Sequence, residues 1–277
     1  MPELPEVETV VRTLRPQILG KTISSVWTSG LSLRMAKRLD EAALRDCCVG
    51  AKIRAVRRRG KFILIDLSRV GGQQIGILVH LGMTGRLRVQ NQREERLKHT
   101  HVVWALPRGS ELRFVDPRRF GSVRAARNID VLPEVRALGL DPLSELDAEK
   151  LRNLLASSRA PIKAFLLDQH RLAGLGNIYV CEALFRARIH PRTRARRAQG
   201  KAELLVRAIR ETLQTGIDNC GTSFRDFVDS TGEPGKNIKA LRVYAREGEK
   251  CFTCAGLVRR LVDGGRSTFY CSRCQKR

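Results

Sequence analysis

Two pairs of cysteines near the end of the sequence constrain the fold most strongly. Cys251 and Cys254 are followed, after sixteen residues, by Cys271 and Cys274, which gives the spacing C-x2-C-x16-C-x2-C. Each pair can place two thiolates on one tight turn, and two such turns complete a tetrahedron around zinc. Four protein ligands close the site, so we expect one structural zinc ion. The alternative, two redox pairs, lacks the strand–helix context of a thioredoxin motif.

The segment between the cysteine pairs predicts a β-hairpin that turns at Asp263, Gly264 and Gly265. So short a module has little apolar surface to bury, and zinc binding worth on the order of 10 kcal/mol would stabilise it. The turn places Arg266 at the tip of the hairpin. A solvated arginine is the simplest interpretation, but an arginine on a basic hairpin can also enter a nucleic-acid groove.

The charge of the chain indicates a polyanionic partner. Lys and Arg number 52 against 28 Asp and Glu, a formal net charge of +24, and the basic residues run along the whole sequence. Nucleic acid is the commonest such partner, with an anionic membrane surface or mere solubility as alternatives. No stretch approaches the ~18 apolar residues of a membrane span, and the first twenty residues lack a signal peptide's apolar core. The remaining cysteines show no disulfide framework, so we expect a cytoplasmic protein.

Residues 21–126 have the texture of strands separated by Gly, Pro and Asp-rich turns. Successive strands without intervening helices predict an antiparallel sandwich or barrel, with helices at its edges. An amphipathic helix precedes them, because Leu4, Val7, Val11 and Leu14 share one helical face. The expected strands are Thr22–Thr28, Lys61–Leu67, Gln74–Leu81, Thr100–Leu106, Glu111–Val115 and Gly121–Ala126.

Beyond a linker at 131–147 the pattern becomes helical. A short loop at 172–176 separates two of the helices, and Asn177 starts the second, where it would ordinarily act as an N-cap. A glycine-rich approach to a helix N-terminus can also bind a phosphate, and Lys163 could contribute to the same surface. The expected helices are 147–157, 161–170, 178–189 and 200–219.

Taken together, these stretches resemble one family, the formamidopyrimidine-DNA glycosylases, in family order over essentially the whole chain. The resemblance implies an α+β protein with an N-terminal β-sandwich domain with flanking helices (1–130), the linker (131–147), a helix-two-turn-helix domain (148–240) and a zinc-binding hairpin (241–277). A lesion-capping loop is expected at about 220–238. The matching stretches are PELPEVETV, RRGKFILIDL, HLGMTGRL, KHTHV, DPRRFGSV, GLGNIYVCEALF, TSFRDFVDSTGEPG, VYAREGEKC and RSTFYCSRCQ.

The resemblance also implies a catalytic set. Removal of Met1 would make Pro2 a free secondary amine, the nucleophile in this family, whose attack on the sugar gives an iminium ion with no N–H to lose. Glu3 matches the general acid/base and Lys61 a hairpin lysine that contacts phosphate flanking the lesion. Arg266 completes the set. The implied reaction is that of a bifunctional glycosylase/AP lyase that removes 8-oxoguanine and formamidopyrimidines with β,δ-elimination.

The implied DNA contacts include residues that fill the gap left by an extruded base. A thioether, a guanidinium and an aromatic ring suit that role, and they match Met83, Arg118 and Phe120. Without the family, Met83 and Phe120 would more often be core residues. DNA binding is expected from His99, Arg118, Lys163 and Asn177.

Departures from the family pattern fall mainly in the capping loop, where Cys220 precedes Gly221 and Lys236–Ile238 replaces the usual continuation. The loop contacts the flipped base, so an endonuclease VIII-like preference for oxidised pyrimidines stays open. A second alternative is a non-catalytic zinc-dependent binder of damaged DNA. The expected partner is double-stranded DNA containing oxidised bases or abasic sites, bound by a bacterial, nucleoid-associated monomer with no membrane contact.

Overall fold

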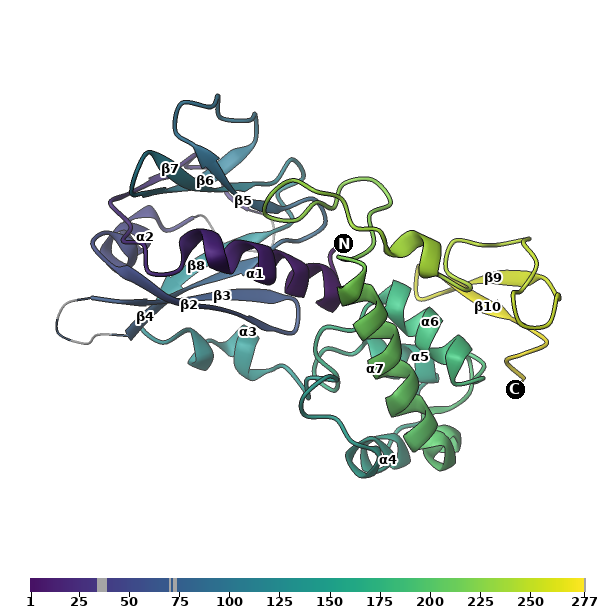
Figure 1. Cartoon of the computed structure of the whole chain (residues 1–277). Helices are drawn as coiled ribbons and strands as arrows, with labels where there is room; N and C mark the ends of the chain where they lie inside the picture. The colour runs from purple at the N-terminus through teal and green to yellow at the C-terminus, as the bar shows by residue number, and fades with distance from the viewer. Residues whose placement is uncertain (34–38, 70, 72–73, 277) are drawn as a thin grey trace. The chain divides into compact units, whose positions relative to one another are not determined.

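The computed structural model describes residues 1–33, 39–69, 71 and 74–276, and within these the chain forms two compact units. The first comprises Met1–Ala137 and Asn219–Lys236, and the second comprises Leu138–Asp218 and Asn237–Arg277. Sheets dominate the first unit, and helices with one hairpin make up the second, so the predicted α+β class is confirmed (Figure 1).

The first unit contains two four-stranded antiparallel sheets with a shared apolar core, as the expected sandwich requires. Their strand orders are β1-β6-β7-β5 and β2-β3-β4-β8. The first sheet consists of β1 (Ser25–Thr28), β6 (Thr100–Leu106), β7 (Ser110–Val115) and β5 (Arg86–Asn91). The second consists of β2 (Lys52–Arg59), β3 (Phe62–Ser68), β4 (Gln74–His80) and β8 (Ser122–Ala126).

Two of these strands, β2 and β5, are absent from the sequence prediction. Both are rich in arginine, and their few apolar residues alternate with charged ones. In β2 only Ile53 and Val56 are buried, and in β5 only Leu87. A strand with one solvated face needs few apolar residues. In these two strands the many basic residues masked the alternation of apolar and polar positions that identifies a strand.

Helix α1 (Leu4–Ile18) covers the core of the first unit with its apolar face, as predicted. Arg15 donates from Nε and Nη2 to the Val56 carbonyl, 3.1 and 2.9 Å away, which joins α1 to β2. A second helix, α2 (Glu41–Cys48), is capped by Asp40, whose carboxylate accepts from the Ala43 N–H at 2.9 Å. Two short helices, η1 (Ile129–Val131) and α3 (Pro133–Arg136), lie at the start of the expected linker.

Residues 219–236 belong to the first unit, although the sequence pattern groups them with the helical domain. The Thr222 N–H donates to Glu6 Oε1 at 2.7 Å, and the Ser230 hydroxyl donates to Thr13 Oγ1 at 2.8 Å. The segment is also braced internally, because Asp229 Oδ1 accepts from four donors in residues 231–233. The compact units also divide inside the predicted linker, between Ala137 and Leu138, and join the predicted helical and zinc-binding ranges, so the predicted domain ranges remain a prediction.

In the second unit α6 packs against α5, α7 and the hairpin, while α4 packs against α7 and η2 (Figure 1). Each expected helix is present; three are shorter at both ends, and α6 begins one residue before and ends three residues before its expected range. No helix within the described ranges is long and apolar enough to cross a membrane. The elements are α4 (Ala148–Ala156), α5 (Ile162–Leu167), α6 (Asn177–Arg186), η2 (Ala195–Lys201), α7 (Ala202–Asp218), η3 (Asn237–Ala240), β9 (Val258–Asp263) and β10 (Arg266–Cys271).

Candidate functional site

The start of α1 buries two carboxyl side chains beside Pro2. Glu3 and Glu6 are only 3% and 2% exposed and form a capping box, in which Glu6 Oε2 accepts from the Glu3 N–H at 2.8 Å. Glu6 Oε1 accepts from Thr222, so one carboxylate binds both the N-terminal segment and residues 219–236. Pro2 itself is buried. The segment that carries the expected nucleophile and acid/base is therefore held rigidly within the first unit.

Lys61 lies in the two-residue turn between β2 and β3, as Arg59 pairs with Phe62 across it. Gly60 supplies the positive φ of 57° that this turn needs. Arg58, at the end of β2, donates to Glu8 of α1 at 3.0 Å, which ties the hairpin to the N-terminal helix. Lys61 is only 7% exposed, so this lysine is not one more solvated charge.

His80 is a buried histidine near Lys61 that the sequence did not single out. Burial, followed by the positive charge of Lys61, lowers the pKa of His80 to about 4. Its Nδ1 accepts from the Gly82 N–H at 3.1 Å, which places the proton of the neutral ring on Nε2. A neutral His80 therefore supports the turn that leads to Met83 without adding charge beside Lys61.

We expect His80 to make the protein less stable as the pH falls. The unfolded chain binds a proton near pH 6.5, whereas the folded chain does so only near pH 4, so acid favours unfolding between these values. Urea unfolding gives the free energy of unfolding at pH 7 and at pH 4.5. The decrease between the two pH values should be smaller in His80→Gln than in the parent, by about 2–3 kcal/mol. An equal loss in His80→Gln would contradict the assignment.

Met83, Arg118 and Phe120 lie on two turns of the first unit rather than in its core. The Met83 side chain is 39% exposed, and the Arg118 guanidinium carbon stands 4.6 Å from the centre of the Phe120 ring. Gly82 has a φ of +60°, and a Cβ there would lie 2.4 Å from the Phe120 carbonyl carbon. The two turns therefore touch, and only glycine permits their approach.

Asp116 joins the two turns, although the sequence did not identify it as a functional residue beyond its place in the stretch DPRRFGSV. Its side chain is fully buried; Oδ1 accepts from the Thr84 hydroxyl at 2.6 Å, and Oδ2 accepts from the Gly121 N–H at 2.7 Å. Thr84 Oγ1 in turn accepts from the Arg118 N–H at 3.3 Å. One carboxylate thus sets the position of Met83 relative to Arg118 and Phe120.

Asp116→Asn is expected to lower the free energy of unfolding by about 2 kcal/mol. The amide can no longer accept on both sides, so either Thr84 or Gly121 loses a charge-assisted hydrogen bond. Denaturant unfolding measures the change, with the exposed Asp46→Asn as the control. A variant as stable as the control would show that Asp116 does not hold the turns together.

His99 is exposed, with a φ of 75°, and its carbonyl accepts from the Asp116 N–H at 3.0 Å. The adjacent His101 is buried instead, where Nδ1 lies 3.1 Å from the Ser29 hydroxyl and Nε2 lies 3.0 Å from the Asp116 carbonyl. Burial lowers the pKa of His101. Of the two histidines, only His99 is free to meet a ligand in solution.

Three predicted residues of the second unit converge at the hairpin tip. Asn177 Nδ2 and Lys163 Nζ both donate to the Ser267 carbonyl, at 2.8 and 3.3 Å, and Lys163 also donates to Thr268 Oγ1 at 2.6 Å. Arg266, the preceding residue, is exposed at the β9–β10 turn. Lys163 is 3% exposed, so its burial favours positioning the hairpin over direct contact with a ligand.

The expected N-cap role of Asn177 is wrong. Gly176 occupies the N-cap position, and Asn177 is the first helical residue. Its Oδ1 is buried with no hydrogen-bond partner among the described residues. The side chain is thus committed to the hairpin, and it does not cap the helix that it begins.

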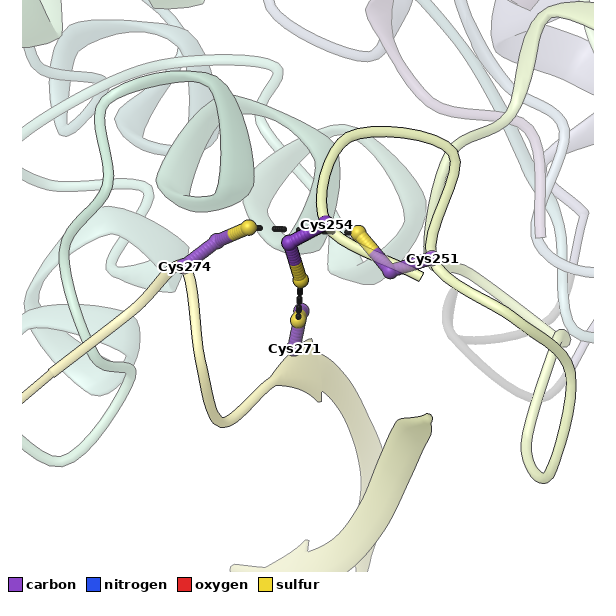
Figure 2. Close-up of side chains that lie close together, drawn as sticks. All are labelled: Cys251, Cys254, Cys271 and Cys274. Carbon is purple, nitrogen blue, oxygen red and sulfur yellow. Dashed lines mark hydrogen bonds between the residues drawn. The ribbon is translucent and has the colours of Figure 1, made fainter. Parts of the chain in front are cut away.

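The four cysteines form a closed metal site in the second unit (Figure 2). Their sulfur atoms lie within 4.8 Å of one another, and the Cys251 and Cys274 sulfurs are 3.9 Å apart. A tetrahedral zinc with bonds of about 2.3 Å separates its sulfur ligands by about 3.8 Å, so the donors and their spacing fit zinc.

Glu182 of α6, buried among apolar residues, accepts from the N–H groups of residues 242–244 and fixes the chain that leads to the site.

Three family models match the chain in succession. Residues 1–123 match the formamidopyrimidine-DNA glycosylase N-terminal domain, residues 138–228 match the formamidopyrimidine-DNA glycosylase H2TH domain, and residues 248–277 match a zinc finger found in FPG and IleRS. Together they cover most of the sequence.

Full-length relatives and solved structures agree with these models. Formamidopyrimidine-DNA glycosylases of Rhizorhabdus wittichii and Pelotomaculum thermopropionicum are 46% and 42% identical, with at least 99% of each chain covered. A Lactococcus lactis Fpg variant bound to DNA containing Fapy-dG superposes with a TM-score of 0.89 at 33% identity, over the whole of both chains. MutM in complex with DNA containing carbocyclic 8-oxo-G gives a TM-score of 0.88 at 34% identity, also over both whole chains.

Proposed function

Since the chain belongs to the formamidopyrimidine-DNA glycosylase family, we propose that it removes oxidised purines from double-stranded DNA with Pro2 as its nucleophile. Membership makes it a base excision repair glycosylase with AP lyase activity and one structural zinc. The observation that carries the proposal is the likeness over the whole chain, which includes the N-terminal segment where Pro2 and Glu3 lie.

The proposed reaction starts when Met1 is removed and Pro2 gains a free amine. The nitrogen attacks C1′ of the sugar, the glycosidic bond breaks, and the oxidised base leaves with the bonding electrons and a proton. The nitrogen loses its own proton, and its lone pair then breaks the C1′–O4′ bond, so that the ring opens and O4′ takes up a proton. The resulting iminium withdraws electrons, so loss of a C2′ proton expels the 3′ phosphate and a second elimination expels the 5′ phosphate. Water then releases Pro2. Glu3, buried beside it, is suited to carry these protons.

Glu6 is proposed as a positioning residue for this chemistry. It accepts one hydrogen bond from Glu3 and another from Thr222, at the base of the loop expected to cap the lesion. A shift of that loop would therefore be felt at the backbone of the acid/base. This supports a reaction that waits until the flipped base is enclosed.

The exposed turns support base extrusion. Met83 and the Arg118–Phe120 pair present a thioether, a guanidinium and an aromatic ring at one place, and Asp116 fixes their relative position. Such a set can fill the gap in the stack and hydrogen-bond the orphaned base. Lys61, His99, Asn177 and Arg266 are proposed to hold the phosphates around the lesion.

Lesion preference is proposed to favour purines, in line with the Fapy-dG and 8-oxo-G complexes of the related structures. Wild-type Lactococcus lactis Fpg has also been solved with DNA containing an oxidised pyrimidine, which keeps the pyrimidine alternative in the test. We propose further that the protein acts as a monomer on chromosomal DNA in the bacterial cytoplasm. Sedimentation of the protein alone and with duplex would check the monomer.

Borohydride trapping tests the proposed function. The zinc-loaded protein, with its intact mass measured, is incubated with duplexes carrying 8-oxoguanine opposite cytosine, thymine glycol opposite adenine, or no lesion. A covalent adduct that forms faster with 8-oxoguanine, on protein lacking Met1, is the expected result. A faster adduct with thymine glycol would favour the pyrimidine alternative. Binding to the damaged duplexes without any adduct would favour the second alternative, a non-catalytic binder of damaged DNA.

A further inference from the structure

A basic cavity of about 1060 Å³ in the second unit lies beside the metal site and apart from the residues expected to contact DNA. Lys163, Asn177 and Arg266 do not line it. One wall comes from the loop after α6 and from η2, and carries Arg188, Arg192, Arg194, Arg197 and Lys201. The other wall comes from the two zinc knuckles and adds Arg273 and Lys276.

Hydrogen bonds fix the two walls to each other. Gln275, just after the last zinc ligand, donates from Nε2 to the Ile189 carbonyl at 2.9 Å, while its Oε1 accepts from the Cys271 N–H at 2.9 Å. Gln275 is 1% exposed. Within the first wall, Lys201 Nζ donates to the Arg188 carbonyl at 3.4 Å. The cavity is therefore built into the fold and depends on the zinc site.

The charges around the cavity are not balanced by the protein. No acidic side chain lines it among the described residues, and only Arg192 among its cations forms an ion pair there, with Asp263 at 2.8 Å. The zinc centre contributes a formal charge of −2, because four thiolates surround one Zn²⁺. Seven cationic side chains line the cavity. One is paired with Asp263 and the metal centre offsets two charges, so the cavity has a net charge of about +4. Like charges around one cavity repel one another, so an external anion would stabilise the arrangement.

We propose that this cavity is a second phosphate-binding site, which takes the backbone of DNA away from the lesion. Its volume exceeds what a single phosphate needs, and its cations lie on two walls, as a polymer of regularly spaced charges requires. Duplex DNA presents one charge per about 1.7 Å of axis, and the planar guanidinium binds phosphate with two parallel hydrogen bonds. The inference relies on the proposed function only in taking DNA as the partner.

Salt dependence of binding to undamaged DNA tests this site. The triple variant Arg188→Gln, Arg194→Gln and Arg197→Gln is compared with a control of equal charge, Arg152→Gln, Arg159→Gln and Arg207→Gln, whose side chains are exposed on the same unit. For a 30-bp duplex, the slope of log Kobs against log salt should fall by about 2–3 in the cavity variant, near 0.9 per lost contact. The control should keep the parent slope. Zinc content and melting temperature confirm that both variants are folded.

Two further arms identify the source of the phosphates. If a 12-bp duplex abolishes the difference between variants, the cavity binds a distant part of the same duplex. If two separately labelled duplexes are bridged by the parent but not by the cavity variant, it binds a second duplex. Equal slopes for the cavity variant and the control overturn the proposal. These duplexes carry no lesion, so the test of the cavity does not depend on whether borohydride trapping supports the proposed function.

Discussion

Pro2→Ala is expected to lower borohydride trapping on an abasic duplex by at least about 10²-fold, or about 2.7 kcal/mol of transition-state stabilisation. After removal of Met1 the variant has a primary amine. Its Schiff base can lose a proton and become neutral, whereas the secondary amine of proline gives an iminium that stays cationic until it is hydrolysed or reduced. DNA affinity should stay within a few-fold, because no phosphate contact is changed.

Pro5→Ala provides the matched control for this experiment. It removes a buried proline from the first turn of the same helix without touching the terminal amine. The control should trap DNA at close to the parent rate, and single-turnover gels with intact-mass spectra measure both variants. Parent-like trapping by Pro2→Ala would mean that another amine forms the adduct.

Cys251→Ser is expected to release zinc and to weaken binding to every duplex by at least about tenfold, or 1.4 kcal/mol. A hairpin with so little buried surface relies on the metal for its fold. Its loss would free Ser267 and Thr268, which accept hydrogen bonds from Asn177 and Lys163, and would leave the neighbouring Arg266 without a fixed position. The effect should be the same for damaged and undamaged DNA, since phosphate contacts carry no sequence information.

Cys220→Ser separates this effect from the loss of any thiol. Cys220 is exposed and lies outside the metal cluster, so the control should keep both its zinc and its affinity. Elemental analysis gives the zinc content, and fluorescence anisotropy gives the affinity. A zinc-free Cys251→Ser protein with unchanged affinity would show that the hairpin does not touch DNA.

The parts of the molecule that depend on local spacing were predictable from the sequence. The cysteine pairs, the glycine turn before Arg266 and the apolar face of α1 each place their determinants within a few residues, so their geometry follows from the period of a helix or a turn. The helices of the second unit were found for the same reason.

Other features were hidden because they arise only when distant segments meet. Asp116 was visible within its motif, but its function depends on Thr84, which lies 32 residues earlier. His80 ends a strand and reads as one more alternating residue until Lys61 lies beside it. Glu182 gave a usable signal, since a charged residue within the apolar run IYVCEALF needs a partner, although the sequence could not name the backbone of residues 242–244.

The sequence did not show that residues 219–236 belong to the first unit, for the same reason. A Gly, Ser and Thr-rich segment after a long helix is grouped by pattern with the helix that precedes it. Its hydrogen bonds to Glu6 and Thr13 span more than 200 residues and leave no periodic trace.

That return of the chain to the first unit sets an order for synthesis. A ribosome releases the N-terminal sheets early, but Glu6 cannot acquire its Thr222 partner until the whole of α7 has been translated. The nascent N-terminal unit therefore remains incomplete through most of elongation. The segment bearing Pro2 reaches its final surroundings only when the zinc-binding end of the chain is about to emerge.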